Sequence, residues 1–251
     1  MSTGAAVAGA PGALAGRVVL VSGAHGGLGR AASLACAQAG ATVVLLGRRT
    51  PKLNRVYDAI IKHGDGGLPE PVNLPLDLAG AGPDDYADLA LRIETQLGRL
   101  DGLLHCAAEF NGLTPLEHTD AAAFARTLHV NLTARWWLTQ ACLPLLKRAA
   151  DGALVFVLDD ATRTAQAYWG AYGLAQHGLA ALVGMLHAEL AGSPVRVSGL
   201  QPGPMRTSLR AQAYVEDDDV QARDPADYAD ACVTLLTPAG AAHRGEVWRP
   251  S

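Results

Sequence analysis

Short apolar runs alternate with amphipathic stretches along most of this chain. Six of the runs are continuously apolar, as expected for strands of a parallel sheet that is covered by helices on both faces. The predicted strands are Val18–Val21, Thr42–Leu46, Val72–Leu76, Leu103–Cys106, Leu154–Leu158 and Val195–Leu200.

Helical periodicity is clear in two of the intervening stretches. Between the second and third strands, apolar residues recur three and four positions apart from Leu53 to Ile61, after a Thr50-Pro51 start and before Gly64. Leucines at positions 179, 182, 186 and 190 form a similar face further on. The alternation of strands and helices predicts an α/β, Rossmann-type fold, in which helices flank both faces of a doubly wound, mostly parallel β-sheet.

Composition agrees with one domain. The chain has 251 residues, 49% of them hydrophobic, which is enough for a large core and excludes general disorder. We expect residues 14–251 to form this domain, after a flexible leader rich in Ala and Gly at residues 1–13. The net charge of −4 provides no basic field for nucleic acid or anionic lipid, and no apolar run reaches the length of about 18 residues that a membrane helix needs.

The cysteines and histidines have no ligand-like spacing. Four cysteines are widely separated and include no CxxC pair, so we interpret them as buried free thiols in a reducing cytoplasm, where we expect the protein to reside. The eight histidines include no HxxxH pair, and no metal site is predicted.

A glycine-rich loop follows the first predicted strand. Ser22-Gly23-Ala24-His25-Gly26-Gly27-Leu28-Gly29 precedes a stretch predicted to be helical from Arg30. Glycines here permit a tight turn and let backbone amides approach a pyrophosphate, although any strand-to-helix turn can use glycine. The place of the loop favours nucleotide binding. His25 either reaches a phosphate or faces solvent.

The end of the second predicted strand suggests which nucleotide binds. An acidic residue there would hold the adenosine ribose hydroxyls of NAD. This chain has Gly47-Arg48-Arg49 instead, and a guanidinium suits a 2′-phosphate. The sequence therefore favours NADP over NAD. In the alternative interpretation, these arginines are solvated residues at a helix start.

Several motifs together resemble the short-chain dehydrogenase/reductase family, from about Leu14 to Trp248. The glycine motif of that family is similar to Ser22-Gly23-x-x-x-Gly27-x-Gly29, and its catalytic asparagine and tyrosine match Asn131 and Tyr172. The resemblance implies an oxidoreductase that binds NADP(H). It implies that the cofactor is held by Gly23, His25, Gly26, Gly27, Leu28, Gly29, Arg48, Asp77, Leu78, Ala107, Gln176, Pro202, Gly203 and Thr207.

Two positions of the resembling catalytic tetrad differ from the family. Gln176 stands where the family has lysine, four residues after the tyrosine, and Asp159 stands where it has serine. No lysine follows Lys147 and no serine lies between Ser33 and Ser193, so no shift of register restores either residue. After the fourth strand, His105-Cys106-Ala107-Ala108 also replaces the family's Asn-Asn-Ala-Gly.

These departures weaken the chemistry that the resemblance implies. In the family the tyrosine transfers the proton, the serine hydrogen-bonds the substrate oxygen and the lysine lowers the tyrosine pKa. Gln176 brings no charge for that purpose. Asp159 either raises the pKa of Tyr172 when ionised, or is neutral and donates a hydrogen bond. Carbonyl reduction is the less damaged direction because it needs a protonated tyrosine. Two functions stay open: an impaired NADP(H)-dependent oxidoreductase, or a non-catalytic protein that binds nucleotide or a protein partner.

Two further regions match places with known roles in the resembling family. Residues 204–224 correspond to its mobile substrate lid, and the acidic run 216–219 is either a solvated face or part of a closing lid. Trp136 and Trp137 follow Asn131 on a helix that in the family builds a subunit interface. The resemblance thus implies a homodimer or homotetramer, whereas the alternative is a core role for one Trp. His177 is expected to face away from Tyr172.

Overall fold

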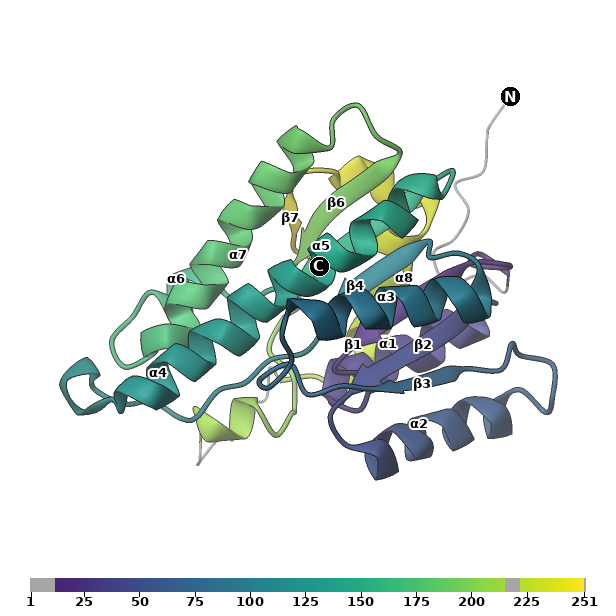
Figure 1. Ribbon diagram of the computed structural model, residues 1–251. Helices are drawn as coiled ribbons and strands as arrows, with labels where there is room; N and C mark the ends of the chain where they lie inside the picture. The colour runs from purple at the N-terminus through teal and green to yellow at the C-terminus, as the bar shows by residue number, and fades with distance from the viewer. Residues whose placement is uncertain (1–11, 215–221, 251) are drawn as a thin grey trace.

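One parallel sheet organises the molecule. The computed structural model describes residues 12–214 and 222–250. Seven strands pair in the order β3-β2-β1-β4-β5-β6-β7, and every pairing is parallel (Figure 1). The strands are β1 (Val18–Ser22), β2 (Thr42–Gly47), β3 (Val72–Pro75), β4 (Gly102–His105), β5 (Gly152–Val157), β6 (Val195–Leu200) and β7 (Val247–Trp248).

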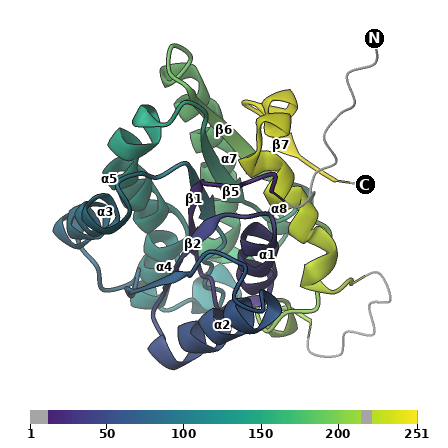
Figure 2. The same ribbon diagram turned by 90° about the vertical axis from the view of Figure 1, so that its right-hand side faces the viewer.

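Helices cover both faces of the sheet. Helices α3, α5 and α7 lie on one face and helices α1, α2 and α8 on the other (Figures 1 and 2). The helices are α1 (Gly27–Gln38), α2 (Thr50–His63), α3 (Pro83–Leu97), α4 (Ala121–Leu128), α5 (Ala134–Arg148), α6 (Ala161–Thr164), α7 (Gly170–Glu189) and α8 (Ala229–Leu236). The predicted Rossmann-type fold is confirmed.

The two layers of helices explain why the strands read as continuously apolar. Along β1, Val18 and Leu20 point into the core under α3, α5 and α7, whereas Val19 and Val21 point into the core under α1, α2 and α8. Successive side chains of a strand face opposite sides, so both sets must be apolar when both sides are covered.

The predicted elements agree with the structure apart from their ends. Each of the six predicted strands is present, with ends within two residues, and α2 begins at Thr50 and has Gly64 as its C-cap. Helix α1 begins at Gly27 rather than Arg30, because the last glycines of the loop form its first turn. The two-residue β7 was missed because it has no apolar run of its own.

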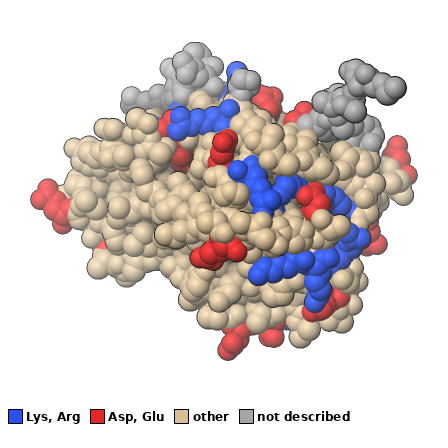
Figure 3. All heavy atoms as spheres, turned by 90° about the horizontal axis from the view of Figure 1, so that it is seen from above, with Lys and Arg blue, Asp and Glu red and all other residues tan. Residues whose placement is uncertain are grey.

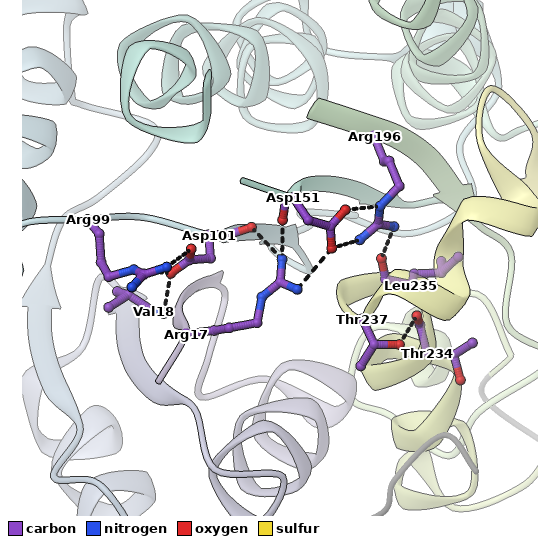
Figure 4. Close-up of polar contacts among 9 residues, drawn as sticks. All are labelled: Arg17, Val18, Arg99, Asp101, Asp151, Arg196, Thr234, Leu235 and Thr237. Atoms are coloured by element: carbon purple, nitrogen blue, oxygen red, sulfur yellow. Dashed lines mark hydrogen bonds and ion pairs between the residues drawn. The ribbon is translucent and has the colours of Figure 1, made fainter. Parts of the chain in front are cut away.

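Ion pairs connect the amino ends of three strands (Figure 4). The glycine loop lies at the opposite, carboxyl ends of the strands. Asp151, just before β5, receives hydrogen bonds from Arg17 at 3.0 Å and from Arg196 at 2.7 and 3.0 Å. Burial opposes ionisation of Asp151, but the two guanidinium groups outweigh it and hold the pKa of its carboxyl below the usual range. These contacts connect β1, β5 and β6 at one point.

The surface carries charges of both signs. In the view from above, basic side chains gather over part of the face with acidic ones among them (Figure 3). Within residues 12–214 and 222–250, no helix is long and apolar enough to cross a membrane, and no cluster of His, Cys, Asp and Glu is arranged to hold a metal. All four cysteines are free thiols; Cys36, Cys142 and Cys232 are buried and Cys106 is partly exposed.

Candidate active site

A cleft of about 530 Å³ opens at the carboxyl ends of the strands. It lies where the chain order reverses between β1 and β4, which is the place where open parallel sheets bind ligands. Every residue that the sequence predicts to hold the cofactor lines this cleft, as do Tyr172 and Asp159. Of the predicted site residues, Asn131 alone lies outside the lining.

The glycine loop is built so that backbone can approach a ligand closely. Gly23 has a φ of +68°, and a Cβ there would lie 2.7 Å from the backbone of Ala107. A Cβ on Gly29 would lie 2.2 Å from the carbonyl oxygen of Gly23. Gly26 caps α1 without any side-chain hydrogen bond, and the first turn carries no acidic residue, so the amide end of the helix is left for an anion. The loop therefore fits a pyrophosphate.

Positive charge collects beside the glycine loop at the end of β2. Arg48, Arg49 and Lys52 line this part of the cleft. Burial and these three charges lower the pKa of His25. The His25 ring lies against Gly47, and its buried Nδ1 has no hydrogen-bond partner within residues 12–214 and 222–250. The His25 ring therefore forms part of the cleft wall, and the residue is partly exposed there.

An acidic residue that the sequence analysis missed also lies near Arg48. Glu109, in the loop after β4, is 3.9 Å from the Arg48 guanidinium and forms a bidentate pair with Arg126 at 2.8 and 3.0 Å. Arg126 lies on α4, so this pair connects the cleft loop to that helix. Because the Arg126 guanidinium offsets the negative charge of Glu109, the net charge at the end of β2 stays positive.

The remaining predicted cofactor residues line other parts of the wall. Asp77 and Leu78 follow β3, and Asp77 Oδ1 accepts a hydrogen bond from the amide of Ala79 at 3.2 Å. Pro202, Gly203 and Thr207 follow β6. The methyl group of Thr207 packs on the glycine loop, since a Cβ on Gly27 would lie 2.6 Å from it.

Tyr172, on α7, is buried and bonded to the residue at the serine position. Its hydroxyl donates to Oδ2 of Asp159 at 3.1 Å. The other oxygen of Asp159 is paired with the Arg163 guanidinium and accepts from the amide of Asp160 at 2.7 Å. Burial first and the Asp159 carboxylate second raise the pKa of Tyr172 well above its ordinary value. The hydrogen bond from Tyr172 and the pair with Arg163 are the contacts that the first of the two roles predicted for Asp159 needs, and that role stays a prediction.

Gln176 lies one turn beyond Tyr172 on α7 and is buried. Its Oε1 accepts the amide of Asp159 at 2.9 Å, so it fixes the backbone that carries the aspartate. Gln176 also lines the cleft. The side chain that replaces the expected lysine is thus a neutral support for Asp159, and it adds no charge near the tyrosine.

Asn131 lies behind the cleft, in a π-helical turn (His129–Thr133) between α4 and α5. Its amide nitrogen donates to the carbonyl oxygens of Glu109 at 2.7 Å and Thr127 at 2.8 Å, and its Oδ1 accepts the amide of Glu109 at 3.0 Å. Both amide hydrogens are used on backbone. Asn131 therefore holds the loop after β4 in place.

Arg135 and an aromatic wall also line the cleft, although no sequence motif indicates them. Arg135 is 1% exposed and donates to the carbonyl oxygens of Val157, at 2.9 Å, and Ala107. The aromatic wall is made by Phe110, Trp169 and Tyr214. Phe110 and Trp169 pack against the Tyr172 ring, and Tyr214 packs against Trp169. Phe110 and Trp169 lie 5.2 Å apart, centroid to centroid.

The segment after β6 adds further polar side chains to the cleft. The Arg210 guanidinium carbon lies 4.3 Å from the centroid of the Tyr214 ring. The backbone of Met205 forms an isolated parallel β-bridge with that of Arg223. The acidic run at positions 216–219 lies outside the described residues. His177 is exposed on α7 and its Nδ1 contacts the carbonyl oxygen of Gly173, so it faces away from the cleft as predicted.

The two tryptophans on α5 have different environments. Trp137 packs against Tyr86 and His129, with ring centroids 6.2 and 5.0 Å away. Trp136 is 43% exposed. One Trp thus has the core role given as the alternative, and the other is free to make contacts with a second molecule.

The sheet order, the glycine loop and the cleft at the strand reversal define a dinucleotide-binding protein of Rossmann type. A family model for short chain dehydrogenases matches residues 17–218, and the chain belongs to that family. Its relatives include the oxidoreductase YciK of Escherichia coli K12, which is 35% identical over 211 residues, or 84% of this chain and 82% of YciK.

Solved structures support the same assignment. A short chain dehydrogenase from Pseudomonas syringae is 40% identical, with a TM-score of 0.90 over 95% of this chain and 96% of the other. A short chain dehydrogenase from Shigella flexneri 2a in complex with NADP is 32% identical, with a TM-score of 0.89 over 95% of this chain and 98% of the other. The chain is thus an oxidoreductase by family and carries a site that fits a nicotinamide dinucleotide.

Proposed function

We propose that the protein is an NADPH-dependent reductase of a carbonyl substrate and works below the usual rate of its family. The observation that carries the cofactor part is the group of basic side chains at the end of β2: Arg48, Arg49 and Lys52 surround the position where an acidic residue would favour NAD. The complex of the Shigella flexneri relative with NADP supports the same choice.

Each group of cleft residues has its own role in the proposed carbonyl reduction. The reduced nicotinamide supplies the hydride when it is bound. The amide end of α1 and the glycine loop would hold the pyrophosphate, and Arg48 and Arg49 would hold the 2′-phosphate. Thr207 and Pro202 lie on the wall where the family meets the carboxamide. Tyr172 gives its hydroxyl proton to the carbonyl oxygen, as general acid.

The low rate follows from the partner of Tyr172. Its hydroxyl proton is bonded to Asp159, so it must leave a carboxylate before it reaches a substrate oxygen. The serine position supplies no neutral hydroxyl donor, and loss of one such donor costs about 10² to 10³ in rate in comparable sites. Because the raised pKa keeps Tyr172 protonated, reduction is favoured over alcohol oxidation.

The aromatic wall of Phe110, Trp169 and Tyr214 supports a substrate with a flat or apolar body. The Arg163 guanidinium lies 5.8 Å from the Trp169 ring centroid and 5.9 Å from that of Tyr214. This combination offers apolar contact and one cation, which suits a ring attached to the carbonyl carbon.

A second candidate function is a non-catalytic protein that binds nucleotide or a protein partner. The observation that favours it is the ion pair of Asp159 with Arg163, which occupies the aspartate at the place where a substrate oxygen would be held. On either function we propose a homodimer or homotetramer in the cytoplasm. Exposed apolar side chains on α5 and α7, namely Trp136, Leu174 and Met185, support such an interface.

The experiment that separates these functions is a nucleotide titration followed by a substrate screen. NADPH and NADH are added to the purified protein while nicotinamide fluorescence and the melting temperature are recorded, since a bound ligand stabilises the fold. NADPH binding, followed by NADPH consumption with aromatic ketones or aldehydes that disappears in Tyr172→Phe, supports the reductase. NADPH binding without consumption supports the second function, and absence of binding contradicts nucleotide binding altogether.

A further inference from the structure

Arg135 is a fully buried cation at the floor of the cleft. It lies on α5, one turn after Asn131, and is 1% exposed. Nη1 donates to the Val157 carbonyl and Nη2 to the Ala107 carbonyl, so the guanidinium spans the ends of β4 and β5 at the floor of the cleft. Its Nε has no hydrogen-bond partner among the residues that the structure describes. Within the described residues, no carboxylate forms an ion pair with it.

Such an arrangement is costly, because a buried charge loses its hydration and is normally compensated by a partner of opposite sign. Burial lowers the pKa of Arg135 to about 10, which still leaves it a cation at neutral pH. Two neutral hydrogen bonds to carbonyl oxygens need only a donor, and an uncharged side chain could supply one. These two hydrogen bonds therefore do not explain why the buried side chain at position 135 carries a charge.

Among the described residues around Arg135, one titratable side chain can become its anion. Burial raises the pKa of the Cys106 thiol to about 12, and burial together with the Arg135 charge holds His105 neutral by lowering its pKa. Asp159 is already paired with Arg163. Tyr172 lines the same cleft as Arg135, and its hydroxyl is bonded to Asp159, two residues after the Val157 carbonyl that receives the Arg135 hydrogen bond. The Arg135 charge accordingly acts to lower the pKa of Tyr172.

We propose that Arg135 supplies, from α5, the positive charge that Gln176 on α7 cannot supply, and that this charge stabilises the Tyr172 phenolate during reduction. The step balances as follows. The O–H bond of Tyr172 breaks, its proton goes to the carbonyl oxygen of the substrate, and the electron pair stays on the phenol oxygen. When bound, the reduced nicotinamide would supply the hydride that the carbonyl carbon needs, so that alcohol and oxidised cofactor would result. Arg135 is a positioning residue that acts through Tyr172.

The phenol is faced by three charged groups, one from each neighbouring element. Asp159, after β5, opposes ionisation, whereas Arg163 from α6 and Arg135 from α5 favour it. Burial has the largest effect and keeps the pKa of Tyr172 high. Arg135 thus limits the rise of the pKa and does not produce the lowered pKa that lysine gives the family. The catalytic step rests on the proposed function, but the electrostatic coupling does not.

The test separates the charge of Arg135 from its hydrogen bonds. Arg135→Gln keeps a donor and loses the charge, whereas Arg135→Lys keeps the charge. The full chain is produced with a multiply fluorinated tyrosine, whose phenol is acidic enough to ionise below pH 10, where Arg135 still carries its charge, and its ionisation is followed by fluorine NMR. Tyr172→Phe identifies the signal. Arg196→Gln is the matched control, because Arg196 is a buried arginine at the opposite end of the strands.

We expect Arg135→Gln to lower the ionisation constant of residue 172 by about ten-fold or more, which is about one pH unit. Arg135→Lys and Arg196→Gln should leave it close to that of the parent protein. If Arg135→Gln does not fold, Arg135→Met serves as the second charge-free variant. Equal ionisation constants in the parent and a charge-free variant would overturn the proposal, even if the protein reduces carbonyls. Conversely, a shifted constant in a protein without turnover would support the coupling while contradicting the proposed function.

Discussion

The hydroxyl of Tyr172 donates its hydrogen bond to a carboxylate, Asp159, over 3.1 Å. A serine at this place would donate to a substrate oxygen, whereas the carboxylate competes with the substrate for the tyrosine proton. The competition is limited by Arg163, which pairs with the same carboxylate. In this site the buried Tyr172 hydroxyl, an acid, is therefore hydrogen-bonded to the Asp159 carboxylate, a base. This arrangement allows proton donation but makes proton removal at neutral pH difficult.

The pH dependence of reduction should reflect this. The pKa of Tyr172 is raised, so the phenol is protonated at every pH below that raised value, and its role as acid is retained up to about pH 10. We expect the single-turnover rate of carbonyl reduction to show no loss from tyrosine ionisation between about pH 6 and 10. Tyr172→Phe should lower the rate by about 10² or more.

A stopped-flow measurement of NADPH absorbance over this pH range checks the prediction. The exposed Tyr168 provides the control, because Tyr168→Phe removes a hydroxyl outside the cleft lining and should keep the rate. A falling limb centred below pH 9 that disappears in Tyr172→Phe would mean that the tyrosine ionises readily, contrary to the prediction.

Restoring the two family residues should raise activity. In Asp159→Ser combined with Gln176→Lys, the carboxylate that competes for the proton is removed and a cation is added on α7. We expect carbonyl reduction to increase by about ten-fold or more, because general acid assistance is typically worth about 10² to 10⁴. The measurement is kcat/KM for NADPH-dependent reduction of the best substrate from the screen.

Gln166→Lys is the control for the added charge, since Gln166 is exposed and does not line the cleft. The Asp159 amide loses its acceptor when Gln176 becomes Lys, so the melting temperature must be recorded in parallel. A folded double variant with no gain would indicate that further cleft residues have diverged from the catalytic arrangement of the family.

The strands could be predicted from the sequence because the sheet is covered on both sides. The six longer strands are continuously apolar, and every one was found with small errors at the ends. β7 has only Val247 and Trp248, and its pairing with β6 depends on the rest of the sheet being in place. The start of α1 was misplaced because the same glycines serve the turn and the first helical residues.

The site could be predicted only where a motif fixes it. Gly23, Asp77 and Thr207 line one cleft because the parallel strands bring their carboxyl ends together. Arg135 gave no signal, since one arginine in a helix reads as a solvated side chain. Its burial depends on two carbonyl oxygens, 28 residues before it and 22 after it, meeting at its guanidinium. Contacts of this kind are created by the tertiary fold.

Cofactor choice should depend on Arg48. Arg48→Asp places a negative charge at the end of β2, where the 2′-phosphate is expected, and creates an acidic group of the kind that holds ribose hydroxyls. We expect NADPH affinity to fall by at least about ten-fold, with a smaller loss or a gain for NADH. Fluorescence titration with both nucleotides measures the two dissociation constants.

Arg55→Asp is the matched control, because Arg55 is exposed on α2 but does not line the cleft. It should leave the ratio of the two dissociation constants unchanged, apart from weak long-range effects that added salt removes. Equal losses of NADPH and NADH affinity in Arg48→Asp would remove the basis for preferring NADP.

Stability should depend on pH through Asp151, which joins β1, β5 and β6. Its folded-state pKa is below the unfolded value, so its contribution is present above the unfolded pKa of about 3.9 and is lost as pH falls through the folded pKa. Asp151→Asn should lower the free energy of unfolding by about 2 kcal/mol at pH 7, because it leaves the buried Arg196 and the partly buried Arg17 without an anion.

Urea unfolding at pH 7, 5 and 3 measures this effect. The difference in the free energy of unfolding between the parent protein and Asp151→Asn should be similar at pH 7 and 5. It should shrink at pH 3, because the Asp151 carboxyl of the unfolded parent protein takes up a proton there. Asp88→Asn is the control, since Asp88 is exposed on α3 and should change stability by less than about 0.5 kcal/mol. A difference that stays constant down to pH 3 would mean that the Asp151 charge contributes nothing and that the loss comes from altered packing alone.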